Sequence, residues 1–203
     1  MNNKYVNRAK ISEAKFRELV RYFVLDLNAK QIAELTKLNR NTVNRYLTEI
    51  RRKIDRYCTA TSELPRVQSG PPDASKGADI QYVLIRYYRG KIITDPVFGS
   101  GNRSLNDQTW VKTSSETGFS LVIDPETGTT VPLTQDSARD QGDTGMNRVK
   151  SFWANAKTRM AKFKGLHPST YRYHLRECEF RFNNRDKDLY QLLLKILRKD
   201  PLF

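Results

Sequence analysis

The stretch from Asn147 to Leu166 constrains the fold most, because apolar and basic side chains recur in it at helical spacing. The apolar positions form one stripe: Val149, Phe152, Trp153, Ala156 and Met160. The other positions carry Lys150, Lys157, Arg159, Lys162 and Lys164, and the stretch contains no Asp or Glu. The pattern predicts an amphipathic helix with one buried face and one face that is entirely positive.

Two further helices are predicted after this stretch. Gly165 is suited to ending a helix, and Pro168 is tolerated in the first turn of the next one. That second helix has an apolar face of Tyr171, Leu175, Cys178, Phe180 and Phe182, and Arg172, Arg176, Arg181 and Arg185 line much of the rest. A last helix begins near Asp188 and ends before Pro201.

Charge is distributed unevenly along the 203 residues. Residues 1–57 carry a net charge of +8, residues 58–146 carry −3, and residues 147–203 carry +9. Basic blocks on folded segments are typical of proteins that bind a polyanion, most often nucleic acid. The charge therefore predicts a nucleic-acid partner for one or both ends of the chain.

The N-terminal block predicts three helices. Ser12 is a good N-cap for the first, whose apolar face is Phe16, Leu19, Val20 and Phe23. Residues 29–36 form the second helix, residues 37–39 a short turn, and Arg40 begins the third. Ile32, Ala33, Leu38 and Val43 stand where a helix-turn-helix needs its packing residues. We therefore expect a helix-turn-helix domain over residues 1–57.

Polar residues begin the third helix, which in a helix-turn-helix enters the major groove of DNA. Asn can pair with adenine and Arg with guanine there. We expect double-stranded DNA to be bound by Arg40, Asn41, Thr42, Asn44 and Arg45. Arg51, Arg52 and Lys53 lie further along the helix, where contacts with phosphate are expected instead.

The middle of the chain has a different composition. Residues 58–78 are rich in Pro, Ser and Gly and predict a linker. The β-rich runs of residues 80–88 and 91–94 surround Gly90 and predict a hairpin. Residues 119–123 predict a short strand that ends at Asp124, and residues 127–134 another.

Targeting and redox signals are absent from the sequence. The two cysteines, Cys58 and Cys178, provide neither a disulfide framework nor a CxxC metal pair. No apolar run resembles a signal peptide or a membrane span. We expect a soluble cytoplasmic protein, associated with the nucleoid and without a membrane partner.

Both ends of the chain resemble small bacterial insertion-sequence transposases of the ISXO type, which belong to the DDE class. The C-terminal match includes Asn147, Phe152, Trp153, Ala156, Lys157, Lys162, Phe163 and Gly165, and then Leu175, Glu177, Cys178, Glu179, Arg181, Phe182 and Asn183. The N-terminal match covers the run Q-I-A-E-L-T-x-L-N-R-N-T-V-N-R-Y. The two segments occur in the same order as in the family.

The resemblance implies an RNase H-like core in which three carboxylates hold two Mg²⁺ ions for strand cleavage and transfer. Asp124 would be the second carboxylate, with a catalytic and metal-binding role, and Lys157 would be the basic residue that faces DNA. Lys150 stands where the family has its third carboxylate. The first Asp motif is missing, and the acids of that interval, Glu63 and Asp73, lie in loop-like sequence.

Three accounts of this mismatch stay open: a decayed transposase, a domesticated DNA-binding protein, or a different alignment in which another acid serves. We predict an α+β fold, with the helix-turn-helix domain at 1–57, a linker at 58–78 and a truncated RNase H-like core with C-terminal helices at 79–203. Mg²⁺ would be bound only if activity remains. We expect an insertion-sequence transposase-like protein that binds DNA at element ends, with strand cleavage and transfer lost or impaired. The alternative functions are a non-enzymatic DNA-binding regulator and, more remotely, an RNA-binding protein. Family members act as multimers on paired DNA ends, which makes a homo-oligomer possible.

Overall fold

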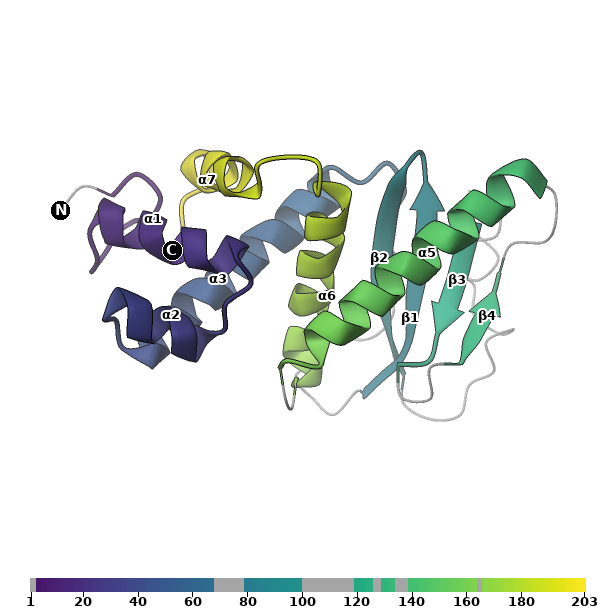
Figure 1. The fold of residues 1–203 in the computed structure, drawn as a ribbon, viewed down its shortest axis with the longest axis horizontal. Coiled ribbons are helices and arrows are strands. Elements are labelled where there is room, and N and C mark those ends of the chain that lie inside the picture. The colour runs from purple at the N-terminus through teal and green to yellow at the C-terminus, as the bar shows by residue number, and fades with distance from the viewer. Residues whose placement is uncertain (1–2, 68–78, 100–118, 126–128, 134–138, 164–165) are drawn as a thin grey trace. The chain divides into compact units, whose positions relative to one another are not determined.

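The chain divides into two compact units. The computed structural model describes residues 3–67, 79–99, 119–125, 129–133, 139–163 and 166–203. Unit 1 comprises Met1–Ala60 and Asn184–Phe203, and unit 2 comprises Thr61–Asn183. Figure 1 shows the helices of unit 1 and the sheet of unit 2.

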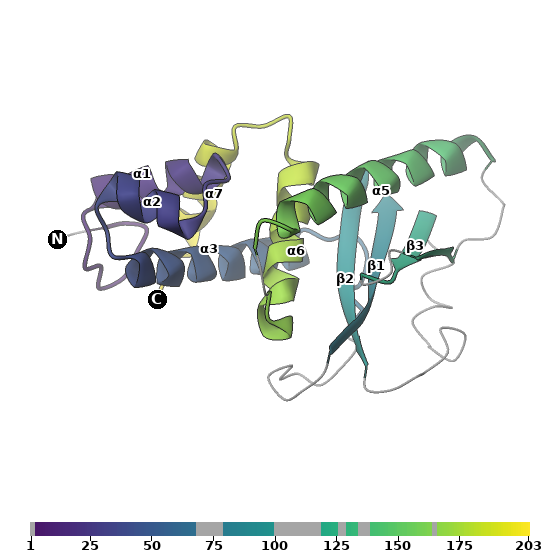
Figure 2. The same ribbon diagram turned by 60° about the horizontal axis from the view of Figure 1, so that its bottom comes forward.

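Three helices of unit 1 follow the sequence pattern closely. They are α1 (Glu13–Val24), α2 (Ala29–Thr36) and α3 (Arg40–Ala60). The Ser12 side chain accepts a hydrogen bond from the Lys15 amide, which confirms the predicted N-cap. The predicted apolar face of α1 is buried, as are Ile32, Val43, Leu47 and Ile50 of the next two helices, and the Phe16 ring packs edge-on against Tyr46 at 5.7 Å. Figure 2 shows α1, α2 and α7 on the same side of α3.

The last helix, α7 (Leu189–Lys199), belongs to unit 1. It packs on α1 and α3 through buried Leu193, Leu194 and Leu197. The segment after it is bound to the N-terminus: Val6 and Leu202 form a parallel bridge, and the Asn7 amide donates to the Leu202 carbonyl at 2.9 Å. The sequence analysis grouped residues 79–203 together, whereas the structure places residues 184–203 with residues 1–60, because the apolar face of α7 is buried there.

Unit 2 contains a four-stranded antiparallel sheet in the order β2-β1-β3-β4. The strands are β1 (Asp79–Tyr88), β2 (Lys91–Gly99), β3 (Phe119–Ile123) and β4 (Thr130–Pro132). The predicted hairpin is confirmed, with Tyr88 opposite Lys91 across a two-residue turn. Arg89 and Gly90 both have positive φ, 46° and 83°, as a tight hairpin turn of this length requires.

Two helices pack on this sheet: α5 (Arg139–Met160) and α6 (Pro168–Asn183). In Figure 1, α5 crosses the strands diagonally, and the apolar stripe predicted from the sequence meets Val83, Ile85, Leu121 and Ile123 in one core. Leu84, Val97 and Val122 form a smaller cluster from the alternate strand positions. The described residues thus form a mixed α+β fold of six helices and one antiparallel sheet. The finer arrangement, a helix-turn-helix beside an RNase H-like core, stays a prediction.

A helix that crosses a bilayer must be long and predominantly apolar, which sets a test for the described helices. None of them is both long enough and apolar enough to cross a membrane.

Candidate nucleic-acid interface

The corner between α2 and α3 is fixed by local hydrogen bonds. The Asn28 side chain accepts from the amides of Lys30 and Gln31, and the Gln31 side chain accepts from the Asn28 amide, which completes a capping box. Lys37 ends α2 in the left-handed conformation, with φ of 56°. The Asn39 side chain then accepts from the Asn41 amide at 2.8 Å and begins α3. These contacts set the angle at which α3 leaves the turn.

The first turns of α3 have one buried and one exposed face. Val43, Tyr46, Leu47 and Ile50 are buried in unit 1. Arg40, Asn41, Asn44 and Arg45 are exposed, and Thr42 is half-buried. Four of the five residues predicted at the start of this helix are therefore exposed on its first turns. Long-range packing holds the opposite face, so these side chains are presented on a rigid element.

The basic residues further along α3 are engaged within the unit. The Arg51 guanidinium lies 5.6 Å from the Phe23 ring centroid, and Arg52 pairs with Glu49. Lys53 is 7% exposed and pairs with Asp200, so its ammonium is used inside unit 1. Lys53 is therefore not at the surface, where a residue that contacts phosphate must lie.

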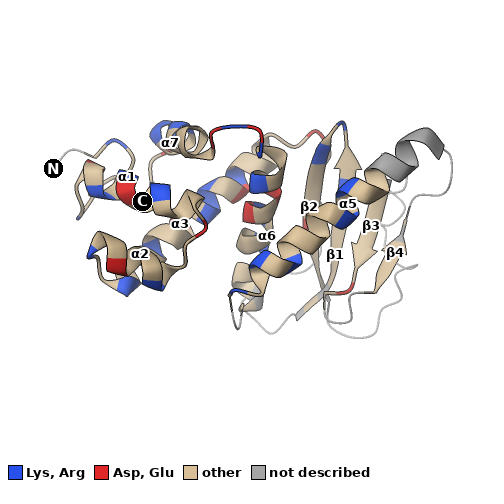
Figure 3. Cartoon of the chain, viewed as in Figure 1, with Lys and Arg blue, Asp and Glu red and all other residues tan. Residues whose placement is uncertain are grey.

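Part of the positive face predicted after Asn147 lies on the outer side of α5, whereas Lys162 follows the end of the helix and Lys164 lies outside the described residues. Lys150 and Lys157 are exposed there, while Val149, Phe152 and Ala156 are buried against the sheet. Figure 3 shows the Lys and Arg positions along this helix. Arg159 lies on its flank and is bound to Glu177 at 2.5 Å, so it is a structural residue.

Asp124 directly follows β3, as the sequence predicted. Its amide donates to the Thr129 carbonyl at 3.0 Å. The residues that the structure describes contain no group of three His, Cys, Asp or Glu side chains able to hold a metal. With a lysine at position 150, these residues do not fit the three-carboxylate set that two Mg²⁺ ions need.

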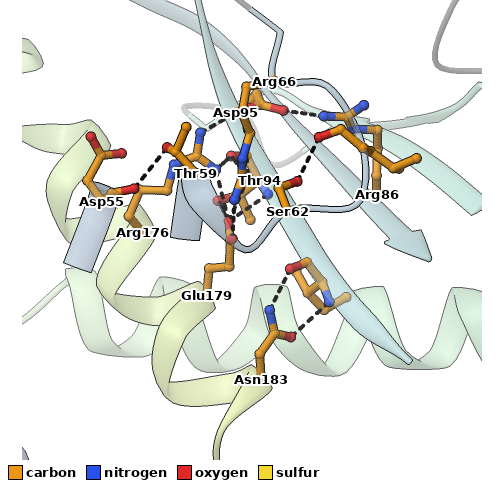
Figure 4. Close-up of polar contacts among 12 residues, drawn as sticks. Asp55, Thr59, Ser62, Arg66, Arg86, Thr94, Asp95, Arg176, Glu179 and Asn183 are labelled. Carbon is orange, nitrogen blue, oxygen red and sulfur yellow. Dashed lines mark hydrogen bonds and ion pairs between the residues drawn. The ribbon is translucent and has the colours of Figure 1, made fainter. Parts of the chain in front are cut away.

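A buried polar network in unit 2 was missed by the sequence analysis. Asp95 of β2 is inaccessible to solvent and pairs with Arg86 at 2.6 Å and with Arg176 at 2.7 Å. Glu179 of α6 pairs with Arg176 at 2.9 Å and accepts two bonds from Arg66, at 2.7 and 3.2 Å. Figure 4 shows these groups converging between α6 and β2. The carboxylates face arginines rather than an open site.

Helix α6 also covers the backbone of β2, the end strand of the described sheet. Asn183 accepts from the Ile92 amide at 2.8 Å and donates to the Ile92 carbonyl at 2.7 Å. Glu179 accepts from the Thr94 amide at 2.9 Å, and Arg176 donates to the Thr94 carbonyl. Pro96, two residues on, has no amide proton to satisfy. Unpaired strand edges promote association, and α6 removes this one.

The segment Glu177–Asn183, part of the transposase resemblance, thus has a structural role at nearly every position. Glu177 pairs with Arg159 and with Arg181, each through Oε1. Cys178 is in the core, and burial raises the pKa of its thiol despite the nearby Arg159, so it is not a reactive nucleophile. The i, i+3, i+7 spacing of Arg176, Glu179 and Asn183 was the available signal that these polar residues share one helix face.

Comparison with known proteins finds a relative that matches part of the chain. Over 57 residues, 28% of this chain, the sequence is 37% identical to a protein of Haemophilus influenzae (strain ATCC 51907 / DSM 11121 / KW20 / Rd) named "Uncharacterized transposase-like protein". The match covers 46% of that protein, so the chain spans less than half of its length. No family model and no solved structure matches the chain. The similarity supports a relation to transposases and nothing finer.

Proposed function

We propose that this chain is a transposase-related protein that binds duplex DNA through the start of α3. The observation that carries the proposal is the run of exposed polar side chains at Arg40, Asn41, Asn44 and Arg45, presented by a rigid two-helix corner. The short α2–α3 turn and the packing of Val43 agree with a helix-turn-helix. The transposase-like relative and the charge of the N-terminal block point to the same ligand.

Sequence readout follows from the chemistry of these side chains. An Asn amide can pair with both polar atoms of the adenine edge, and an Arg guanidinium with both acceptors of guanine. We assign base contacts to Arg40, Asn41 and Asn44. Each such pair contributes about 1–3 kcal/mol of discrimination against a wrong base. The ligand would be the ends of an ISXO-type element, bound on cytoplasmic or nucleoid DNA.

We further propose that the chain lacks the DDE strand-transfer activity and acts as a DNA-binding regulator. Lys150 replaces a carboxylate, and an ammonium repels a divalent cation. Asp95 and Glu179, two buried carboxylates at the sheet edge, are held by three arginines. The assay is nicking of a bound element-end duplex in Mg²⁺, and the expected result is intact DNA. Metal-dependent nicking would instead make the chain an enzyme.

DNA binding is tested by selection from random duplexes at two salt concentrations. The variant Arg40→Ala/Asn44→Ala removes one cation and one amide from α3, and Lys195→Ala/Gln191→Ala removes the same groups from the exposed face of α7. We expect the wild type and the α7 variant to recover one sequence motif, and the α3 variant to lose it. Equal behaviour of both variants, or preference for single-stranded RNA over duplex DNA, would refute the proposal.

A further inference from the structure

A pocket of about 1010 Å³ lies in unit 1 beside the start of α3. It is lined by the segment from Val6 to Ile11, by Leu38, Thr42, Arg45 and Tyr46, and by Phe203. Two of these residues, Thr42 and Arg45, are among those that the sequence analysis expected to bind DNA. The pocket therefore joins the N-terminal segment to the surface proposed to bind DNA.

The side chains that line the pocket carry a net positive charge. Arg8, Lys10 and Arg45 contribute three cations to its lining, which includes no Asp or Glu side chain. None of the three is in an ion pair with a carboxylate of the described residues, whereas neighbouring Lys4 is bound to Glu13 at 3.1 Å. Cations grouped without acidic partners are favourable for an anion. Thr42 and Asn7 add uncharged hydrogen-bonding groups.

Arg45 is held in a fixed position at this pocket. Its guanidinium lies 4.1 Å from the centroid of the Phe203 ring, which in turn packs edge-on against Tyr46 at 5.8 Å. The Asn7 side chain fixes Phe203 by donating to its carbonyl at 2.8 Å. Such stacking leaves the guanidinium edge available while it restrains the plane. Arg45 therefore lies on the side of α3 that lines the pocket.

The backbone at Arg8 is also conformationally restricted. Its φ is 49°, in the left-handed region that non-glycine residues rarely adopt. The packing of Tyr5, Val6 and Ile11, all buried, holds the segment on either side of it. Both Arg8 and Lys10 are exposed, so the segment presents its cations from a fixed backbone.

We infer that this pocket is a phosphate subsite for the backbone of duplex DNA, in which Arg8, Lys10 and Arg45 neutralise phosphates while α3 reads the bases. The inference rests on the proposed function and reassigns Arg45 from base readout to backbone contact. Phosphate contacts fix the register of a protein on DNA without specifying sequence. The pocket would orient α3 in the groove.

The test is the salt dependence of binding to a selected duplex and to a scrambled duplex. The variant Arg8→Asn/Lys10→Ala removes two cations from the pocket and places at position 8 a residue that tolerates positive φ. Its control, Lys195→Ala/Arg198→Ala, removes two exposed cations from α7. We expect the pocket variant to bind both duplexes more weakly than wild type, with affinity reduced by the same factor for each. The slope of log K against log salt should become shallower by about 2 relative to wild type. The control should keep the slope within about 1.

Arg45→Gln gives a second readout. This substitution should lower the affinity for both duplexes alike. Substitution of a base-reading residue would lower the affinity for the selected duplex alone. If wild type binds and the pocket variant equals the control, the inference is wrong while the proposed function stands. If wild type binds neither duplex, the proposed function fails first. Binding of inorganic phosphate that Arg8→Asn/Lys10→Ala abolishes, with DNA affinity unchanged, would make this a free-phosphate site and overturn the inference.

Discussion

Unit 1 and unit 2 use the same side chain, arginine, in opposite ways. In unit 2, Arg86 and Arg176 are each 2% exposed and are bound to the buried Asp95 of β2. In unit 1, Arg40 and Arg45 are exposed on the first turns of α3. A count of basic residues treats the two groups as equal. The difference shows that burial and pairing, rather than charge, separate arginines that hold a fold from those that can bind a partner.

The positive face of α5 is intermediate between these cases. Lys150 and Lys157 are exposed, but Arg159 on the same helix is bound to a buried carboxylate. The sequence motif after α5 is likewise structural, because Glu179 and Asn183 cover the edge of β2. Glu179 and Asn183, two residues of this motif, therefore have a structural role in unit 2.

Asp95→Ala should lower the stability of unit 2 more than any other substitution proposed below. It leaves two buried guanidinium groups without their shared carboxylate, and breaking a buried pair in this way costs about 3–5 kcal/mol. Glu63→Ala is the matched control, because Glu63 pairs with Lys91 and Arg89 at the surface, where a pair contributes about 0–1 kcal/mol. Denaturant unfolding measures both changes. Equal losses for the two variants would contradict the distinction between buried and exposed pairs.

Leu193→Ala tests whether α7 belongs to unit 1. Leu193 is fully buried, and truncation of such a side chain costs about 2–5 kcal/mol, whereas Leu25→Ala removes a side chain that is 63% exposed. Cys58 is buried in unit 1 and Cys178 in unit 2, so the alkylation rate of each thiol reports its own unit. We expect Leu193→Ala to accelerate alkylation of Cys58 alone. Faster alkylation of Cys178 alone would restore the grouping of residues 79–203.

Asn183→Ala should have the smallest of these effects. It exposes or leaves unpaired the amide and carbonyl of Ile92, at a cost of about 1–3 kcal/mol. Asn155→Ala on the exposed side of α5 is the matched control. Unfolding and light scattering together measure stability and strand-edge association. An unchanged midpoint and a monodisperse protein would show that α6 does not protect the edge through Asn183.

Local patterns were sufficient to predict most of the elements. Ser12 capped α1, residues 29–36 formed α2, and the turn at Gly90 separated β1 from β2, because caps, helical spacing and hairpin turns act within a few residues. Asp124 at the end of β3 was placed for the same reason. These features depend on neighbours in the chain.

Long-range pairing was the part that the sequence could not provide. Asp95 and Arg176 are separated by 81 positions, and Lys53 and Asp200 by 147. The partner of each residue cannot be identified from the local sequence around it. The sequence analysis therefore treated Arg176 as one of several helix arginines and predicted a phosphate contact for Lys53. The placement of α7 was missed for the same reason, since an apolar helix face does not specify which core it joins.

Amide hydrogen exchange with and without a selected DNA duplex tests the central claim most directly. The first amides of a helix have no intrahelical partner, so the exchange of those in α3 responds to a ligand placed on them. We predict that DNA slows exchange in peptides covering residues 6–11 and 37–45 and leaves the sheet of unit 2 unchanged. Slowing confined to residues 147–163 of α5, or no slowing at residues 37–45 while DNA is bound, would contradict the account.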